Sequence, residues 1–307
     1  MKSNFRHLAL TKLCGWFGIS RQAYYQNNRE SIAATLEEHL VLQQVRHIRT
    51  NHHQIGTRKL YEMMQPFLFE HRIKVGRDAL FSMLAVNHLL VRKRKRRIQT
   101  TNSQHWFRKY PNLIRGLVPS SINQLWVSDI TYWKICSDKH LYISFITDAY
   151  SRKVVGYHVA QSLEAVESVQ ALQMALSSLR PEGNLQLTHH SDRGMQYCSH
   201  AYVKLLQDYN IRVSMTENGD PLENAIAERI NGIIKEEYLD HYQIKDITQA
   251  EELLKTVIEL YNRERPHMSI SNLTPNQVHY SQTEIKPQKL WKNYYRKQPM
   301  FVNPVQD

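Results

Sequence analysis

Three acidic residues in different local contexts constrain the fold of this chain more than any other feature. Asp129 stands in Leu125-Trp-Val-Ser-Asp-Ile-Thr-Tyr-Trp133, a run rich in the β-branched and aromatic residues typical of a strand. Asp192 follows a second strand-like run, Leu185-Gln-Leu-Thr-His189, and Glu228 lies further along in a segment with helical periodicity. A few converging carboxylates can hold hard divalent cations together with phosphate oxygens. We therefore expect a fold that brings two strands and one helix to a common site for phosphoryl transfer.

The residues around these acids predict an α/β domain. Strand-like runs occur at Leu141–Thr147, Lys153–Ala160 and Ile211–Met215. Apolar residues at helical spacing in 165–179, and a helix-like run at 199–209, predict two helices between the strands. With the two runs that carry Asp129 and Asp192, five strands are expected.

The third acid has to be chosen among several glutamates, and helix geometry makes the choice. Asp220 followed by Pro221 resembles a helix start, in which Glu223 takes the place of a capping-box glutamate. Four polar residues share one face of the helix that follows, away from a stripe of isoleucines: Asn224, Glu228, Asn231 and Lys235. We therefore assign Glu228 to the metal site and expect Lys235, two turns beyond it, to meet a DNA phosphate.

Four sequence blocks occur in order over about residues 120–280. They are Asp129-Ile-Thr-Tyr132, then His190-Ser-Asp-Arg-Gly-Met-Gln-Tyr197, then Glu223-Asn-Ala-Ile-Ala-Glu228 with Ile234-Lys-Glu236, and finally Tyr261-Asn-Arg-Glu-Arg-Pro-His267 leading to Leu273-Thr-Pro275. Together they resemble the retroviral-integrase-type DDE core of insertion-sequence transposases, in particular the second-reading-frame product of the IS-three group. Glu223 departs from the Asp usual in that family, and Arg229-Ile230 from a Ser-Phe-like pair, but neither departure touches the three acids. The resemblance implies an RNase H-like fold, a mixed five-stranded sheet with flanking helices.

The resemblance also implies a DNA transposase that cleaves transposon ends and transfers the 3′-hydroxyl strand to a phosphodiester. Asp129, Asp192 and Glu228 would hold two Mg²⁺ or Mn²⁺ ions, and no covalent enzyme–DNA intermediate would form. Expected partners are double-stranded DNA, both terminal inverted repeats and target, further copies of the chain on that DNA, and an upstream-frame helix-turn-helix protein, separate or fused. Two alternatives stay open: an RNase H-like nuclease without strand transfer, and a non-catalytic transposase-derived DNA-binding regulator.

Basic charge is concentrated in the N-terminal part of the chain. Residues 1–120 carry 21 Lys and Arg against 6 Asp and Glu, whereas the remainder carries 19 against 22. Phosphate neutralisation and counterion release supply most of the salt-dependent affinity of a DNA enzyme. Six consecutive basic residues favour a phosphate-tracking linker over a solvated tail: Arg92, Lys93, Arg94, Lys95, Arg96 and Arg97.

The first 90 residues predict all-α, helix-turn-helix-like modules. A helix at Leu8–Trp16, a turn capped by Ser20 and a short helix at Arg21–Tyr25 form the first pattern. Its candidate DNA contacts are Arg21, Gln22 and Tyr24. The alternative is a helical packing unit that touches no DNA.

Further helices are expected at Leu36–His47, at Thr57–Met64 with Thr57 as the cap, and at Arg77–Val86. The last two resemble a second helix-turn-helix of the family, in which Arg77 is a candidate DNA contact. The expected domains are 1–90 (helical DNA-binding modules), 91–119 (basic linker), 120–280 (catalytic core) and 281–307 (C-terminal tail).

Arg263 and Arg265 end a helix predicted at Glu251–Asn262, which Pro266 stops. From the residues alone they form a C-cap cluster. The resemblance implies instead that they contact DNA ends, so both interpretations stay open.

Several other classes of protein are disfavoured. The three cysteines are far apart and form no Cys-x-x-Cys pair, which argues against a zinc module, and no P-loop motif occurs. There is no apolar run long enough for a membrane span and no signal-peptide pattern. We expect a protein of the bacterial cytoplasm that associates with the nucleoid.

Overall fold

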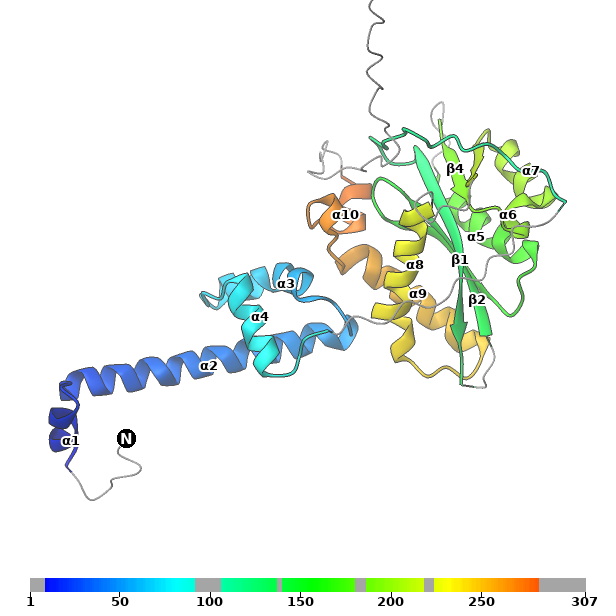
Figure 1. Ribbon diagram of the computed structural model, residues 1–307. Helices are drawn as coiled ribbons and strands as arrows, with labels where there is room; N and C mark the ends of the chain where they lie inside the picture. The colour runs from blue at the N-terminus through cyan, green and yellow to red at the C-terminus, as the bar shows by residue number, and fades with distance from the viewer. Residues whose placement is uncertain (1–8, 92–105, 137–139, 180–185, 218–223, 282–307) are drawn as a thin grey trace, which may run out of the picture. The chain divides into compact units, whose positions relative to one another are not determined.

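A five-stranded mixed sheet organises the larger part of the chain (Figure 1). The computed structural model describes residues 9–91, 106–136, 140–179, 186–217 and 224–281, with the side chains of 27–35 excepted. The strands are β1 (Leu125–Lys134), β2 (His140–Asp148), β3 (Val154–Ala160), β4 (Thr188–Ser191) and β5 (Arg212–Met215). Their order is β3-β2-β1-β4-β5; β1, β2 and β3 pair antiparallel, whereas β4 runs parallel to β1 and to β5. This is the RNase H-like sheet that the sequence predicted.

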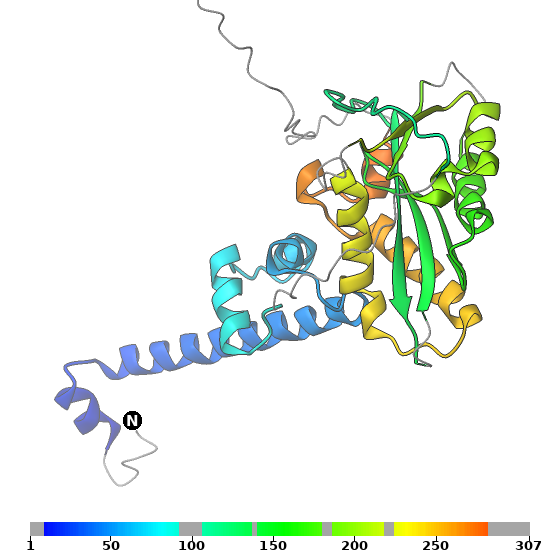
Figure 2. The same cartoon turned by 45° about the vertical axis from the view of Figure 1, so that its right-hand side comes forward.

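Helices cover both faces of the sheet (Figures 1 and 2). On one face lie α5 (Ala165–Ser177), α6 (Met195–Cys198) and α7 (His200–Asp208). On the other lie α8 (Ala225–Glu237) and α9 (Ile247–Glu264). A short helix, α10 (Pro275–His279), follows α9 and begins with a complete capping box on Thr274.

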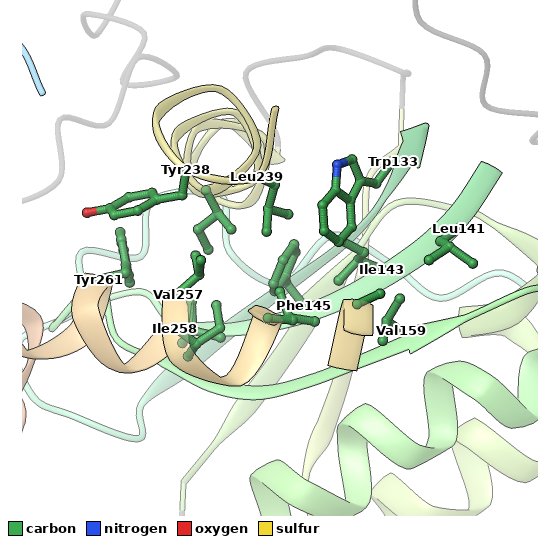
Figure 3. Close-up of a cluster of buried hydrophobic side chains, with 14 of the residues drawn as sticks. Trp133, Leu141, Ile143, Phe145, Val159, Tyr238, Leu239, Val257, Ile258 and Tyr261 are labelled. Carbon is green, nitrogen blue, oxygen red and sulfur yellow. The ribbon is translucent and has the colours of Figure 1, made fainter. Parts of the chain in front are cut away.

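The α8–α9 face holds the largest apolar cluster (Figure 3). Successive side chains of a strand point to opposite faces, so alternate residues of β1, β2 and β3 enter this cluster. From the sheet come Trp133, Leu141, Ile143, Phe145 and Val159, and from the helical side come Tyr238, Leu239, Val257, Ile258 and Tyr261. Burial of this face fixes α8 against β1, the strand that carries Asp129.

On the opposite face, α5 lies close against the sheet. Trp126 and Ile146 meet the small residues of α5, among them Ala171 and Ala175. A Cβ added to Gly156 of β3 would collide with the carbonyl oxygen of Ala171 and lie 2.8 Å from the Cβ of Ala175. A glycine is therefore required at this crossing of β3 and α5.

The predicted strands and helices of this part form close to their expected bounds, with two larger differences. The helix predicted at Glu251–Asn262 is α9, which begins at Ile247 because Asp246 caps it, and ends at Glu264. The strand before Asp192 is Thr188–Ser191 rather than Leu185–His189. Its pairing with β1 begins only where Thr188 lies opposite Leu125, so the partner strand determines where β4 starts. Asp192 still directly follows the strand.

The chain divides into two compact units. The first comprises residues 1–50 and 56–91, and the second comprises 51–55 and 92–307. The first unit is helical, with α1 (Leu10–Trp16), α2 (Arg21–Asn51, whose last residue belongs to the second unit), α3 (Thr57–Glu70) and α4 (Arg77–Val86). The predicted linker and tail remain predictions, because residues 92–105 and 282–307 lie outside the described residues.

Two predicted helices of the first unit are wrong in extent. The short helix at Arg21–Tyr25 and the separate helix at Leu36–His47 are one helix, α2. The intervening sequence contains neither Gly nor Pro, so nothing in it stops the helix. Ser20 does cap the start, since its Oγ accepts from the backbone N–H of Ala23 at 3.0 Å.

The third helix also runs further than predicted. It continues from Thr57 to Glu70 with Pro66 in its interior, and its N-cap is Gly56, not Thr57. An interior proline removes one helical hydrogen bond, but Leu60, Met64 and Leu68 remain on one buried stripe across it. Burial of this stripe outweighs the local cost of the proline. Among the helices of the described segments, none has the length and apolarity of a membrane span.

Candidate active site

Asp129 and Asp192 lie where the parallel strands β1 and β4 separate. Val127 is opposite His190 in the β1–β4 register, so Asp129, two residues further on, reaches the same edge as Asp192. Both aspartates line a pocket of about 350 Å³. Its walls come from β1, β2, the segment before α5 and the segment after Asp192, and include Tyr132, Tyr142, Leu163, Gly194 and Tyr197.

The three predicted acids act on one another electrostatically. Burial raises the pKa of Asp129 well above its usual value, and the charges of Asp192 and Glu228 raise it further. Burial, followed by the charge of Asp192, also raises the pKa of Glu228. The fold therefore brings Asp129, Asp192 and Glu228 into one electrostatic neighbourhood, as the sequence predicted.

Two asparagines attach α8 to β1. The Nδ2 of Asn231 donates to Oδ2 of Asp129 at 2.9 Å, and the Nδ2 of Asn224 donates to the carbonyl oxygen of Ser128 at 2.9 Å. Both side chains are buried. The prediction that Asn231 contacts DNA is therefore wrong: it is 5% exposed, and it orients Asp129 instead.

The predicted helix start at Asp220, Pro221 and Glu223 lies outside the described residues. The described helix begins at Ala225 with Asn224 as its N-cap. Glu228 is in the first turn of this helix, half-buried.

Lys235 extends along β1 beyond Asp129. Its ammonium group donates to the carbonyl oxygen of Tyr132 and lies 4.1 Å from the centre of the Tyr132 ring. Because Tyr132 lines the pocket, Lys235 sits at the margin of the site. Its contact with a phosphate remains a prediction.

The two histidines before Asp192 are structural residues of the sheet. The Nε2 of His189 lies 2.6 Å from Oγ of Ser128 and 2.9 Å from the hydroxyl of Tyr202. Burial, assisted by His190, lowers the pKa of His189 to about 3, so its ring is neutral. The Nδ1 of His190 is 2.8 Å from Oγ of Ser214.

The donor chemistry of the three acids fits a hard divalent cation. Carboxylate oxygens are the ligands that Mg²⁺ and Mn²⁺ prefer, and a cation would relieve the repulsion that raises the pKa of Asp129. Within the described part of the chain, no three His, Cys, Asp or Glu side chains are grouped closely enough to hold a metal ion as they stand. To share a cation, the three carboxylates would have to converge further.

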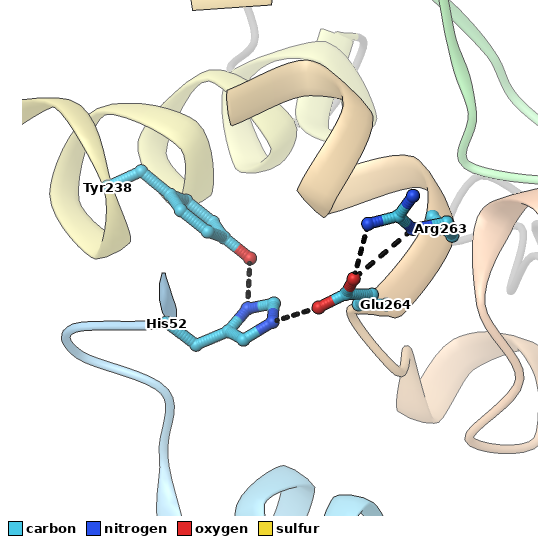
Figure 4. A network of polar contacts seen from close by, with 4 residues as sticks. All are labelled: His52, Tyr238, Arg263 and Glu264. Atoms are coloured by element: carbon cyan, nitrogen blue, oxygen red, sulfur yellow. Dashed lines mark hydrogen bonds and ion pairs between the residues drawn. The ribbon is translucent and has the colours of Figure 1, made fainter. Parts of the chain in front are cut away.

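A polar network joins the ends of α8 and α9. Arg265 is fully buried and donates to both carboxylate oxygens of Glu237, at 2.8 and 2.7 Å. His52, in the segment 51–55 of the same unit, lies 2.9 Å from the Tyr238 hydroxyl and 3.2 Å from Oε2 of Glu264 (Figure 4). The prediction that Arg265 contacts DNA is wrong, because a buried guanidinium bonded to Glu237 cannot reach a phosphate.

The remaining candidate DNA contacts are on the surface or outside the described residues. The side chain of Arg263 is 64% exposed and pairs with Glu264. Arg21 and Gln22 are exposed, Tyr24 is half-buried, and Arg77 is exposed beside Asp78. The six basic residues Arg92, Lys93, Arg94, Lys95, Arg96 and Arg97 lie outside the described residues. All of these remain predictions.

The sequence does not reveal what two residues of the site contact. Asn231 lies on the helix face expected from the sequence, but its bond to Asp129 depends on how α8 packs on β1. Tyr197 belongs to the block that contains Asp192, and its place in the pocket depends on the tertiary structure. Its place five residues after Asp192, behind a glycine turn, is the only signal that pointed to the site.

Comparisons with known proteins find an integrase core in the part of the chain that holds the sheet and the three acids. Residues 119–221 and 209–275 each match a family model described as an integrase core domain. An uncharacterized 31 kDa protein of insertion element IS600 from Shigella sonnei is 35% identical over 268 residues, which are 86% of this chain and 96% of the relative. The transposase for insertion sequence element IS629 from Shigella sonnei is 30% identical over 260 residues, 82% of this chain and 85% of the relative.

Two further likenesses cover about half of the chain. Transposase InsF for insertion sequence IS3A from Escherichia coli K12 is 35% identical over 161 residues, 52% of this chain and 54% of the relative. The catalytic core domain of HTLV-2 integrase in complex with magnesium superposes with a TM-score of 0.42 at 21% identity, over 52% of this chain and 98% of that one. Since the IS600 and IS629 relatives align along most of both chains, and the sheet and the integrase-core matches agree with them, this chain belongs to the IS-three group of insertion-sequence transposases, polynucleotidyl transferases with an integrase-type core.

Proposed function

We propose that the protein cleaves transposon ends and transfers the freed 3′-hydroxyl strand to another phosphodiester, with two divalent cations held by Asp129, Asp192 and Glu228. The meeting of β1, β4 and α8 supports this proposal most strongly, because it gathers three acids beside a pocket at one edge of the sheet. Attack by water or by a DNA 3′-hydroxyl needs no side-chain nucleophile, so no covalent enzyme–DNA intermediate forms.

The protein's own residues would position the ligands before DNA arrives. Asp129 accepts from the backbone N–H of Ile130 and from Asn231, both at 2.9 Å. Asp192 accepts at Oδ1 from the backbone N–H of Gly194 at 3.0 Å. Bound Mg²⁺ or Mn²⁺ would supply Lewis acidity at the attacking and leaving oxygens. The pocket beside the two aspartates would admit the scissile phosphate.

The substrates would be double-stranded DNA, namely the terminal inverted repeats and a target duplex. Each transposon end needs an active site for its cleavage and joining, so we propose that at least two copies act together on the DNA. An upstream-frame helix-turn-helix partner, separate or fused, remains a prediction from the sequence.

The acids provide the first test. Asp129→Asn, Asp192→Asn and Glu228→Gln should each abolish cleavage and joining while leaving binding to terminal DNA largely intact, because the amide keeps the shape and removes the charge that holds the cations. Joining is measured by incubating the full chain with Mg²⁺, pre-cut terminal repeats and a plasmid, and binding by gel shift. Glu236→Gln, an exposed carboxylate on the same helix, is the matched control and should be active.

The same assay separates the proposal from the nuclease alternative. Joined products from the unaltered protein support strand transfer, whereas Mg²⁺-dependent cutting without any joined product contradicts it. Full joining by the Glu228→Gln variant would show that another residue is the third metal ligand.

A further inference from the structure

Tyr197 presents a buried hydroxyl beside the pocket of the active site. Tyr197 lies on α6, is 3% exposed and lines the pocket together with Asp129 and Asp192. Its hydroxyl oxygen is shielded from solvent and has no hydrogen-bond partner among the residues that the structure describes. Burial, and then Tyr202, Asp129 and Asp192, raise its pKa well above the usual value, so the hydroxyl remains a hydrogen-bond donor close to both carboxylates.

Tyr202, a neighbour in the same aromatic cluster, has a hydrogen-bond partner for its buried hydroxyl, as buried polar groups usually do. The ring of Tyr202 packs edge-on against those of Tyr197 and His189, with centroid distances of 5.3 and 5.4 Å. The hydroxyl of Tyr202 lies 2.9 Å from Nε2 of His189. Thus the Tyr202 hydroxyl has a partner, whereas the Tyr197 hydroxyl has none among the described residues.

A buried donor without an acceptor is costly and uncommon in native proteins, so each one calls for an explanation. The carboxylates whose charges act on this hydroxyl are those of Asp129 and Asp192. Asp129 accepts at both oxygens, from Ile130 and Asn231. If the acids converge on a cation, as the proposed function requires, their carboxylates are rearranged relative to one another, and each oxygen can still accept a further bond.

The position of Tyr197 relative to Asp192 allows it to take part in that rearrangement. The backbone N–H of Tyr197 donates to the carbonyl oxygen of Gly194 at 3.1 Å, and the N–H of Gly194 donates to Oδ1 of Asp192 at 3.0 Å. A Cβ added to Gly194 would lie 3.0 Å from Oδ1 of Asp192 and 3.7 Å from the Tyr197 ring. One tight turn therefore connects the carboxylate and the tyrosine.

We infer that Tyr197 is a positioning residue whose hydroxyl donates a hydrogen bond to the Asp129–Asp192 pair when these carboxylates hold a divalent cation, and so fixes their orientation. This inference rests on the proposed function, because it needs a metal at this site. Carboxylates that bind metals are themselves usually hydrogen-bonded, and loss of such an outer partner costs roughly 10–100-fold in metal affinity or activity.

Tyr197→Phe and Tyr202→Phe in the full chain form a matched pair for the test. Both remove one hydroxyl and keep the packed ring. Tyr197→Phe removes a donor that has no partner among the described residues, so the melting temperature measured without added metal should be unchanged or higher. Tyr202→Phe breaks a bond to a buried histidine, so its melting temperature should fall by about 2–4 °C. These measurements also show that both variants fold.

Metal titrations then test the positioning role. With Mg²⁺ alone and no DNA, the rise in melting temperature should require about tenfold more Mg²⁺ for Tyr197→Phe than for the unaltered protein. Strand joining at low Mg²⁺ should fall by a similar factor and recover at high Mg²⁺. Tyr202→Phe should match the unaltered protein in both titrations, measured well below its melting temperature.

The outcomes separate this inference from the function on which it rests. If the unaltered protein shows no metal-dependent joining, the proposed function fails and the inference fails with it. If the unaltered protein joins DNA and Tyr197→Phe follows it in both titrations, only the inference is overturned. Loss of joining at every Mg²⁺ concentration, with an unchanged thermal titration, also overturns it, since the hydroxyl would then act on DNA rather than through the carboxylates.

Discussion

His189 illustrates how burial determines the state of a single residue near the active site. The Nε2 of its ring lies within hydrogen-bonding distance of Ser128 on β1 and Tyr202 on α7, and its pKa falls to about 3, mainly because burial disfavours the charged form. In the unfolded chain a histidine titrates near pH 6.5. The unfolded state therefore binds this proton first, and acid shifts the equilibrium towards unfolding. The stabilising effect is complete above about pH 6.5 and is lost as the pH falls towards 3.

We predict that the unfolding free energies of the unaltered protein and of a His189→Gln variant depend differently on pH. Between pH 6.5 and pH 5 the unaltered protein should lose about 2 kcal/mol of unfolding free energy through His189, at roughly 1.4 kcal/mol per pH unit. His189→Gln keeps an acceptor for Ser128 and Tyr202 but does not titrate, so it should lack this part of the loss. Urea denaturation of both proteins at pH 7.5 and pH 5 gives the comparison, in which other titrating groups, such as Asp129, largely cancel. Equal losses in the two proteins would contradict a neutral, buried His189.

At the level of elements, α8 and α9 depend on each other at their C-terminal ends. Arg265 follows α9 and pairs with Glu237, the last residue of α8, while His52 bridges Tyr238 and Glu264 (Figure 4). The apolar cluster of Figure 3 packs α8 and α9 against the sheet. Because α8 carries both Glu228 and Asn231, this network helps to hold the third acid in place.

Replacing Arg263 or Arg265 at this junction should have different effects on the free energy of unfolding. Arg265→Ala should lower the unfolding free energy by about 3 kcal/mol, because it leaves the Glu237 carboxylate partly buried without its partner. Arg263→Ala, two residues away and 64% exposed, should change it by less than about 0.5 kcal/mol. Chemical denaturation measures both. An Arg265→Ala protein of full stability that binds terminal DNA poorly would restore the DNA-contact interpretation.

At the scale of the whole molecule, the charge distribution predicts that DNA affinity and chemistry reside in different parts of the chain. The basic excess lies in residues 1–120, whereas the remainder, which includes the three acids, has more acidic than basic residues. Charge of this kind supplies affinity for any duplex, whereas side chains that reach base edges supply sequence preference. The six basic residues 92–97 are expected to contribute to the affinity for any duplex and not to sequence preference.

Neutralising that block in the full chain tests this division. Replacing all six residues 92–97 by Gln should weaken binding to terminal repeats and to unrelated duplexes alike, and should flatten the plot of log affinity against log salt by up to about 5 in slope. Binding is measured by fluorescence anisotropy over a range of salt concentrations. Arg21→Ala is the control, and it should reduce the preference for terminal repeats more than the salt slope. A selective loss of repeat binding in the neutralised variant would contradict the division.

Much of the fold, and the candidate acids, could be predicted because they depend on near neighbours in the chain. A run rich in β-branched and aromatic residues indicated the strand that carries Asp129, and helical spacing indicated the face of α8 that carries Glu228. The predictions that proved wrong depend on distant partners or on burial over a longer stretch: α3 continues past Pro66, and β4 begins where β1 meets it.

By itself the sequence determined the order of the elements, the choice of candidate acids and the concentration of basic charge. Only the tertiary structure decided that Asn231 holds Asp129, that Arg265 is buried against Glu237, and that Tyr197 has a buried hydroxyl without a partner among the described residues. The physical reason is that periodicity and turn chemistry act over a few residues, whereas a hydrogen bond between α8 and β1 joins groups a hundred residues apart. Such contacts exist only once both faces of the sheet are packed.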